Sequence, residues 1–369
     1  MRPARRGRRA TRASAPPQRT RVGLRYHARV RGPYIAGPVY DAVMFIGAPL
    51  LALALGVAIS GTAIADEEIV VWGRAGTVTS FFIGSFVMAH LGLVVVRSHL
   101  NPQIFRRHPL RFVAAPLLLL FLLWASDWAL ALAIVVSVWW DAVHSSLQTF
   151  GLGRIYDARR GNPSAVGRRL DLGLNLLLYL GPILAGATLL DHLSAFAAFE
   201  HVGAIVFRQV PIHAEAHQAA FAEALVIGGS IYLIAYVLQY IRLARQGYAT
   251  SWQKVALLVA TGACSIYTWG FNSFGEAFFI MNFFHAWQYF GLVWWSERAN
   301  LRRLGRLERV RWGGTAALAM MLLAAGAYGV WAEWVDGREQ RLALAATLVV
   351  SLMHFWYDGF IWSVRRREV

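Results

Sequence analysis

Runs of about 20 apolar residues recur along this 369-residue chain, and they constrain its fold more than any other feature. A helix of that length spans a hydrocarbon core of about 30 Å, since each residue adds about 1.5 Å. Hydrophobic side chains make up 57% of the sequence, more than the roughly 45–50% that is usual in soluble domains. The sequence therefore predicts an all-α fold, a polytopic integral membrane helical bundle.

Hydropathy predicts about ten transmembrane helices in a single domain that covers residues 40–366. The expected spans are 42–63, 76–97, 112–126, 128–150, 171–190, 221–242, 255–272, 276–296, 313–334 and 342–364. Only Ser126, Asp127 and Trp128 separate the third span from the fourth. These two spans therefore form either a tight hairpin or a kinked pair.

The basic residues indicate how the spans are oriented, because short cytoplasmic loops collect Lys and Arg. With the N-terminus inside, 32 of the 36 basic residues fall on inner segments, and the exceptions are Arg74, Arg208, Arg338 and Arg341. We therefore expect both termini in the cytoplasm, in a membrane such as the bacterial inner membrane. The net charge of +16 reflects this sidedness, so membrane lipids are expected partners and nucleic acid is not.

The N-terminal segment is strongly basic and has eleven arginines in its first 31 residues. It contains no apolar stretch of the kind that a secretory signal has. We interpret residues 1–39 as a disordered basic tail on the cytoplasmic face. An organellar transit peptide or a wrongly assigned start codon would give the same composition.

Ionisable side chains at bilayer depth are costly, and they mark functional positions by default. In this chain such side chains, with polar neighbours, fall on four even-numbered spans. The second span carries His90, the fourth carries Asp141, His144 and Gln148, the eighth carries His285, Gln288 and Tyr289, and the tenth carries His354 and Asp358.

The four histidines are expected at similar depths in the membrane. In chain order they lie 7, 10, 13 and 11 residues before the next inner arginine. These separations correspond to depths of roughly 10–20 Å below the cytoplasmic helix ends. Because even-numbered spans all run from outside to inside, the sequence predicts four imidazoles in one slab of the bilayer.

Spacing within each helix gives three of the four histidines polar partners, since residues three, four and seven apart share a helix face. A neutral imidazole binds iron, copper or zinc through one nitrogen, while a carboxylate or amide holds the other N–H. The single cysteine, Cys264, excludes Cys-rich zinc and iron–sulfur sites.

From this pattern we predict a metal site. Its ligands would be His90, His144, His285 and His354. The side chains that orient these imidazoles would be Asp141, Gln148 and Gln288, and the catalytic candidates are Asp358 and Tyr289. The alternative is that each histidine only hydrogen-bonds a neighbouring helix.

Three segments, DAVHSSLQTF, FFHAWQYFGLVW and MHFWYDGFIWSVR, resemble parts of the Brp/Blh-type β-carotene 15,15′-dioxygenases. The resemblance implies a polytopic membrane enzyme with non-haem iron, in which His144, His285 and His354 match iron-binding histidines. Where that family has the second histidine of a His-x-x-x-His pair, this chain has Tyr289. The family's N-terminal Pro-His-Gly-Ala-x-Asp motif is absent, and His90 is a candidate replacement for the missing ligand.

The sequence therefore favours a membrane non-haem iron oxygenase, or a related oxidoreductase, that uses O₂ on a lipophilic small molecule. Aromatic side chains crowd the same helices, and they suit either a pocket for such a substrate or packing against lipid. Three alternatives remain open. They are a haem-binding membrane protein, a proton-coupled transporter that uses the buried His and Asp side chains, and a structural or assembly membrane protein.

Overall fold

The computed structural model describes residues 32–336 and 340–362, and these residues are almost entirely helical. The predicted tail, residues 1–39, lies mostly outside this part of the chain. The N-terminal elements are α1 (Pro38–Asp41), the π-helix η1 (Ala42–Ile46), α2 (Ala48–Ile59), α3 (Ala63–Asp66), β1 (Glu68–Val71), β2 (Arg74–Thr77), α4 (Val78–Gly92), α5 (Val94–Ser98) and α6 (Pro102–Phe105).

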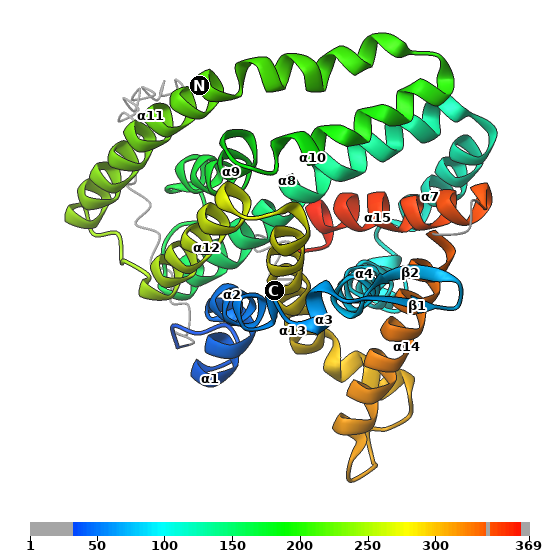
Figure 1. The fold of residues 1–369 in the computed structure, drawn as a ribbon. Coiled ribbons are helices and arrows are strands. Elements are labelled where there is room, and N and C mark those ends of the chain that lie inside the picture. The colour runs from blue at the N-terminus through cyan, green and yellow to red at the C-terminus, as the bar shows by residue number, and fades with distance from the viewer. Residues whose placement is uncertain (1–31, 337–339, 363–369) are drawn as a thin grey trace, which may run out of the picture.

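The remaining elements include the longest helices of the bundle (Figure 1). They are α7 (Pro109–Ala125), α8 (Asp127–Arg159), α9 (Arg168–Ala185), α10 (Leu189–Ser194), the 3₁₀ helices η2 (Ala195–Val202) and η3 (Ile205–Arg208), α11 (Gln209–Arg245), α12 (Trp252–Phe271), α13 (Phe274–Leu304), α14 (Gly313–Asp336) and α15 (Arg341–Ile361).

The chain is a multi-pass membrane protein. Within the described residues, six helical segments are long and apolar enough to cross a bilayer, and two bent helix pairs raise that number to as many as eight. The predicted count of ten is not confirmed. The expected third span is the 17-residue α7, and the expected eighth span, α13, does not meet the same test of apolarity. The helix is interrupted at Ser126, which separates α7 from α8. The Ser126 hydroxyl accepts a hydrogen bond from the backbone N–H of Ala129 and so caps the start of α8.

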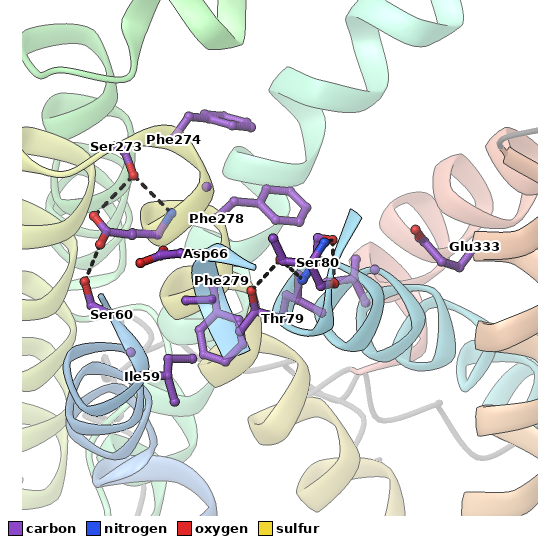
Figure 2. Close-up of a pocket in the computed structure, with 18 of the residues that line it drawn as sticks. Ile59, Ser60, Asp66, Thr79, Ser80, Ser273, Phe274, Phe278, Phe279 and Glu333 are labelled. Carbon is purple, nitrogen blue, oxygen red and sulfur yellow. Dashed lines mark hydrogen bonds between the residues drawn. The ribbon is translucent and has the colours of Figure 1, made fainter. Parts of the chain in front are cut away.

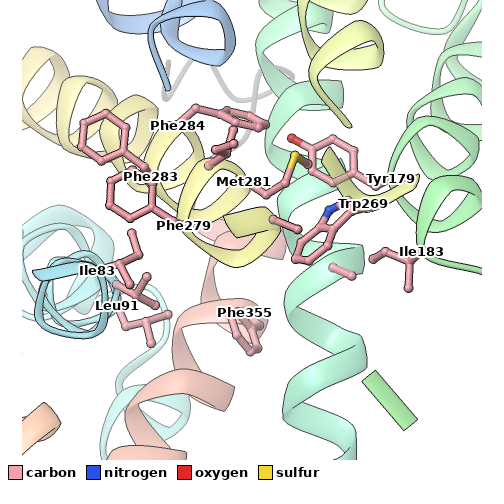
Figure 3. Close-up of a cluster of buried hydrophobic side chains, with 14 of the residues drawn as sticks. Ile83, Leu91, Tyr179, Ile183, Trp269, Phe279, Met281, Phe283, Phe284 and Phe355 are labelled. Atoms are coloured by element: carbon pink, nitrogen blue, oxygen red, sulfur yellow. The ribbon is translucent and has the colours of Figure 1, made fainter. Parts of the chain in front are cut away.

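Helix α13 is less apolar than a lipid-facing span because other helices enclose it. Almost every residue from Phe279 to Val293 is buried, including the polar Asn282 and Gln288. Helices α2, α4, α12 and α14 pack around it. Its aromatic side chains form much of the hydrophobic core, where Phe279 and Phe283 lie against Ile83 of α4 (Figure 3). Polar groups on α13 therefore face protein, where side chains of other helices can bind them.

Residues just before the predicted domain boundary at residue 40 make defined contacts with the helices. The carboxylate of Asp41 accepts hydrogen bonds from the backbone N–H groups of Ile35 and Ala36, and from the hydroxyl of Tyr156. Ile35 is buried as a result. Residues 35–37 are thus pinned to α8, and the packed domain includes part of the segment that we expected to be disordered.

The hairpin of β1 and β2 is the only β-structure among the residues that the structure describes. It joins α3 to α4, and its Arg74 pairs with Glu333 of α14 at 2.8 Å. The hydroxyl of Thr77 accepts from the backbone N–H of Ser80, which caps the start of α4. The hairpin thereby fixes the end of α4 relative to α14.

Candidate metal centre

Four imidazoles from helices far apart in the sequence meet inside the bundle. His90 comes from α4, His144 from α8, His285 from α13 and His354 from α15, helices that lie near one another in Figure 1. Adjacent rings form a closed circuit with centroid separations of 5.0 Å (His90 to His285), 5.1 Å (His285 to His144), 4.7 Å (His144 to His354) and 5.1 Å (His354 to His90). None is more than 3% exposed. The four side chains predicted to share one slab thus also lie side by side.

The donor atoms fall into two overlapping groups. His90, His285 and His354 each offer one nitrogen, and these three atoms lie within 4.8 Å of one another. His144, His354 and Asp358 form a second group on the same criterion. Two ligand atoms about 2.1 Å from one ion lie at most about 4.2 Å apart, so a small inward movement suffices for either group. His354 belongs to both groups and lies between them.

Hydrogen bonds restrict how His354 can act. Its Nδ1 lies 3.2 Å from the carbonyl oxygen of Leu91, and a carbonyl only accepts, so Nδ1 carries the proton. In the neutral ring, Nε2 then presents a lone pair, 3.0 Å from Nε2 of His144. A backbone carbonyl therefore fixes the tautomer of His354, and its unprotonated Nε2 faces Nε2 of His144, from which it can accept a hydrogen bond.

His90 and His285 have no comparable partners. Both ring nitrogens of each are buried, and none makes a well-formed hydrogen bond to a residue that the structure describes, although the His90 ring approaches the backbone of Val87, one turn earlier on α4. Leaving one buried polar group unpaired lowers the stability of the folded protein by about 1–3 kcal/mol, so four such atoms within one cluster are strongly destabilising. Buried atoms of this kind are compatible with a bound metal ion or with ordered water.

Asp358 lies at the edge of the cluster in a defined orientation. Its Oδ1 accepts from the Tyr289 hydroxyl at 3.0 Å and from the Trp362 indole N–H at 2.9 Å. Its Oδ2 lies 3.7 Å from Nε2 of His144 and 3.8 Å from Nε2 of His354. One oxygen is thus occupied by two donors while the other faces the imidazoles.

Trp362 itself is held by a buried ion pair. The guanidinium of Arg97 lies 4.1 Å from the Trp362 ring centroid and donates to Glu297 at 2.6 Å. Asn101 also donates to the Glu297 carboxylate. Because a cation over an indole face is attracted to it, this arrangement fixes the ring that donates to Asp358.

The three side chains predicted to orient the imidazoles make no hydrogen bond to them among the described residues. Gln288 donates to the carbonyl of Phe45 at 2.8 Å and accepts from Gln148, which also donates to the backbone carbonyl of His285. These amides connect α8, α13 and η1 instead of binding ring nitrogens. Asp141 makes no hydrogen bond within the described part of the chain. Amide side chains in a dry interior bind the backbone carbonyls nearest to them, and spacing along one helix does not reveal those carbonyls.

A second buried polar cluster was not predicted. Lys254 of α12 donates to Asp157 of α8 at 2.8 Å and to Asp171 of α9 at 3.1 Å. Arg154 donates to the same two carboxylates, at 2.7 and 2.5 Å. We had counted both cations as inner-segment charge, yet each is at most 6% exposed. The signal available in the sequence was Asp157, three residues after Arg154 on the same helix; Lys254 lies 97 and 83 residues from the two acids.

No protein-family model, no curated protein and no solved structure matches this chain. The argument about function therefore depends on the geometry of the histidine cluster.

Proposed function

We propose that this protein is a membrane metalloenzyme that binds non-haem iron through His90, His144, His285 and His354, with Asp358 as a further ligand or an adjacent base. The observation that supports the proposal most strongly is the set of four unpaired ring nitrogens on His90 and His285. Imidazole with a carboxylate is a donor set that iron, copper and zinc accept, and the site contains no thiolate. Bound iron would supply the activation of O₂ for oxidation of a lipophilic substrate.

The protein's own side chains would prepare the site in two ways. The Leu91 carbonyl holds the proton of His354 on Nδ1, so Nε2 carries the lone pair that would bind a metal in place of its contact with Nε2 of His144. Tyr289 and Trp362 occupy one oxygen of Asp358 and leave the other facing His144 and His354. Both contacts preorganise donors before a metal arrives, and the surrounding core excludes water.

Metal analysis of detergent-purified protein tests this proposal. We expect stoichiometric iron in the wild type and at least about a tenfold loss in His144→Ala, since even residues that only support a ligand cost 10–100-fold in affinity. His192→Ala is the matched control, because His192 is also buried but binds the Thr188 carbonyl outside the cluster. Equal, trace metal in wild type and His144→Ala would contradict the proposal.

An absorption spectrum of the same samples separates non-haem iron from haem. A Soret band that disappears in His144→Ala would assign the histidines to haem and reject the non-haem proposal. The resemblance to the β-carotene dioxygenases supports non-haem iron, and it gives no more than a lipophilic substrate class.

We also propose that both termini lie in the cytoplasm, as in a bacterial inner membrane protein. The proposal is supported by the 32 of 36 basic residues that fall on one side of the predicted layout. Cysteine labelling with a membrane-impermeant reagent tests it: a cysteine in place of Arg74 should react in intact cells, and one in place of Arg106 should not.

A proton-coupled transporter is the second candidate, and one observation favours it. Buried side-chain oxygens without hydrogen-bond partners among the described residues lie on α8, α9 and α12, which pack together; they are those of Ser146, Asn175, Thr261 and Ser265. Ordered water fits such atoms and, in a continuous chain, conducts protons. If the protein is a transporter, metal-free protein reconstituted in vesicles should conduct protons across the vesicle membrane. A proton flux equal to that of empty vesicles would reject this candidate function.

A further inference from the structure

A cavity of about 660 Å³ opens between α2, the β-hairpin, α4 and α13. It is outside the histidine cluster, and neither the sequence nor the resemblance indicated it. Figure 2 shows Ser60, Asp66 and Ser273 together on one side of it, Glu333 on the opposite side, and Phe278 and Phe279 between them. Small-molecule sites commonly have volumes of about 300–1,000 Å³, so the space is large enough for a ligand.

The cavity extends along α4 toward the metal centre. Its wall on this helix runs from Thr77 to Met88. Eleven residues of α-helix correspond to about 16 Å. Val87 and Met88 at the deep end lie three and two residues before His90 on the same helix. The cavity thus approaches within one helical turn of a proposed metal ligand.

The chemistry of the wall changes along this length. Near the helix ends, Glu276 accepts from the hydroxyls of Ser60 (2.6 Å) and Ser273 (3.2 Å), and Asp66 lies beside them. At the deep end the wall is formed by Ile83, Val87 and Met88, with the Phe279 ring stacked on Phe283. A polar, acid-bearing mouth therefore leads to an apolar interior.

Acidic side chains outnumber basic side chains in the lining of the cavity. Glu333 lies against Gly84, midway along the α4 wall, and is paired with Arg74; at the mouth, Asp66 and Glu276 have no ion pair with any residue that the structure describes. Carboxylates accept hydrogen bonds and repel anions, so the mouth favours a head group that donates hydrogen bonds. A carboxylate head in the same place would face two like charges.

We propose that this cavity binds the substrate, and that the substrate is a long-chain amphiphile with a hydroxyl or ammonium head. The head lies at Glu276 and Asp66, and the far end of the chain lies at Val87 and Met88, next to His90. The inference rests on the proposed enzyme function, since it gives that site its substrate class. It also defines the orientation: oxidation takes place on the chain, away from the head.

Photolabelling of metal-free protein tests the cavity independently of iron. A twelve-carbon alcohol with a diazirine at its last carbon is expected to label the peptide that contains Ile83, Val87 and Met88. The matching ammonium probe should label the same peptide, and the matching fatty acid should label it about tenfold less. Labelling near Asp66 instead of Val87 would reverse the orientation and overturn the proposal.

Two variants and one control complete the experiment. Met88→Trp fills the deep end and should lower labelling of the Val87 peptide about tenfold, whereas Met320→Trp, on an exposed face of α14, should not change it. Should Met88→Trp fail to fold, Glu276→Gln at the exposed mouth decides: fatty-acid labelling should rise about tenfold toward that of the alcohol. Equal labelling by all three probes in the wild type would also overturn the proposal. Iron content has no part in these results, so a failure here is distinct from a failure of the metal site.

Discussion

Replacing Lys254 by methionine is expected to lower the free energy of unfolding by about 3–5 kcal/mol, because it removes one partner from a buried ion cluster. Lys254 and Arg154 neutralise Asp157 and Asp171, and all four side chains are buried where α8, α9 and α12 meet. Without Lys254, one of the two carboxylates keeps a charge that the protein interior does not compensate. Denaturant titration of the purified protein measures the loss.

A double variant distinguishes charge imbalance from lost packing. Lys254→Met with Asp157→Asn leaves the Arg154–Asp171 pair, whose atoms are 2.5 Å apart, as a balanced unit. We expect the double variant to be more stable than Lys254→Met alone, which is a non-additive result for residues in one network. If the two substitutions destabilised additively, the ion cluster would not be the reason.

Replacing His285 by leucine is expected to stabilise the metal-free protein by about 1–3 kcal/mol, although it removes a proposed ligand. Both ring nitrogens of His285 are buried without partners among the described residues, so an apolar side chain of similar size relieves their desolvation. With iron at about a thousandfold excess over its Kd, the wild type should gain about 4 kcal/mol and the variant none. The order of the two stabilities therefore inverts on adding metal.

His354→Leu is the matched control for this inversion. His354 is equally buried, but its Nδ1 binds the Leu91 carbonyl and its Nε2 faces His144. Its replacement leaves that carbonyl and the His144 nitrogen without partners, so the metal-free protein should lose stability. If His285→Leu also destabilised the metal-free protein, its imidazole would be an ordinary structural contact.

The sequence predicted the helical class and the proximity of four histidines because both follow from one-dimensional rules. Apolar runs define the helices, and counting residues from the arginines that we assigned to the inner side gave His90, His144, His285 and His354 a common expected depth. Depth limits a side chain to a slab, and the rotation of each helix decides whether side chains in that slab meet. That rotation depends on packing between helices, so the closed circuit of rings was visible only in three dimensions.

Other features depended on contacts that no spacing rule contains. A hydropathy profile describes each helix separately and contains no information about its neighbours. It therefore does not show that other helices enclose α13, which allows α13 to carry the buried polar residues Asn282, His285 and Gln288. Arg154 was counted as loop charge, yet α8 continues to Arg159 and buries it. Gln148 and Gln288 bind backbone carbonyls that spacing within α8 or α13 cannot locate.

The distribution of the four histidines has a consequence for how the protein is made. The rings come from positions 90, 144, 285 and 354, and the last belongs to α15, the final helix of the described chain. The N-terminal segment also depends on a helix that is made much later. Trp287 and Gln288 of α13 donate hydrogen bonds to the carbonyls of Val43 and Phe45, which lie 244 and 243 residues earlier in the chain. A ribosome-bound chain that has not yet inserted α15 therefore lacks His354, the one donor common to both groups. Uptake of metal at the proposed site would therefore follow the insertion of α15, so the site cannot load while the earlier helices are still being made.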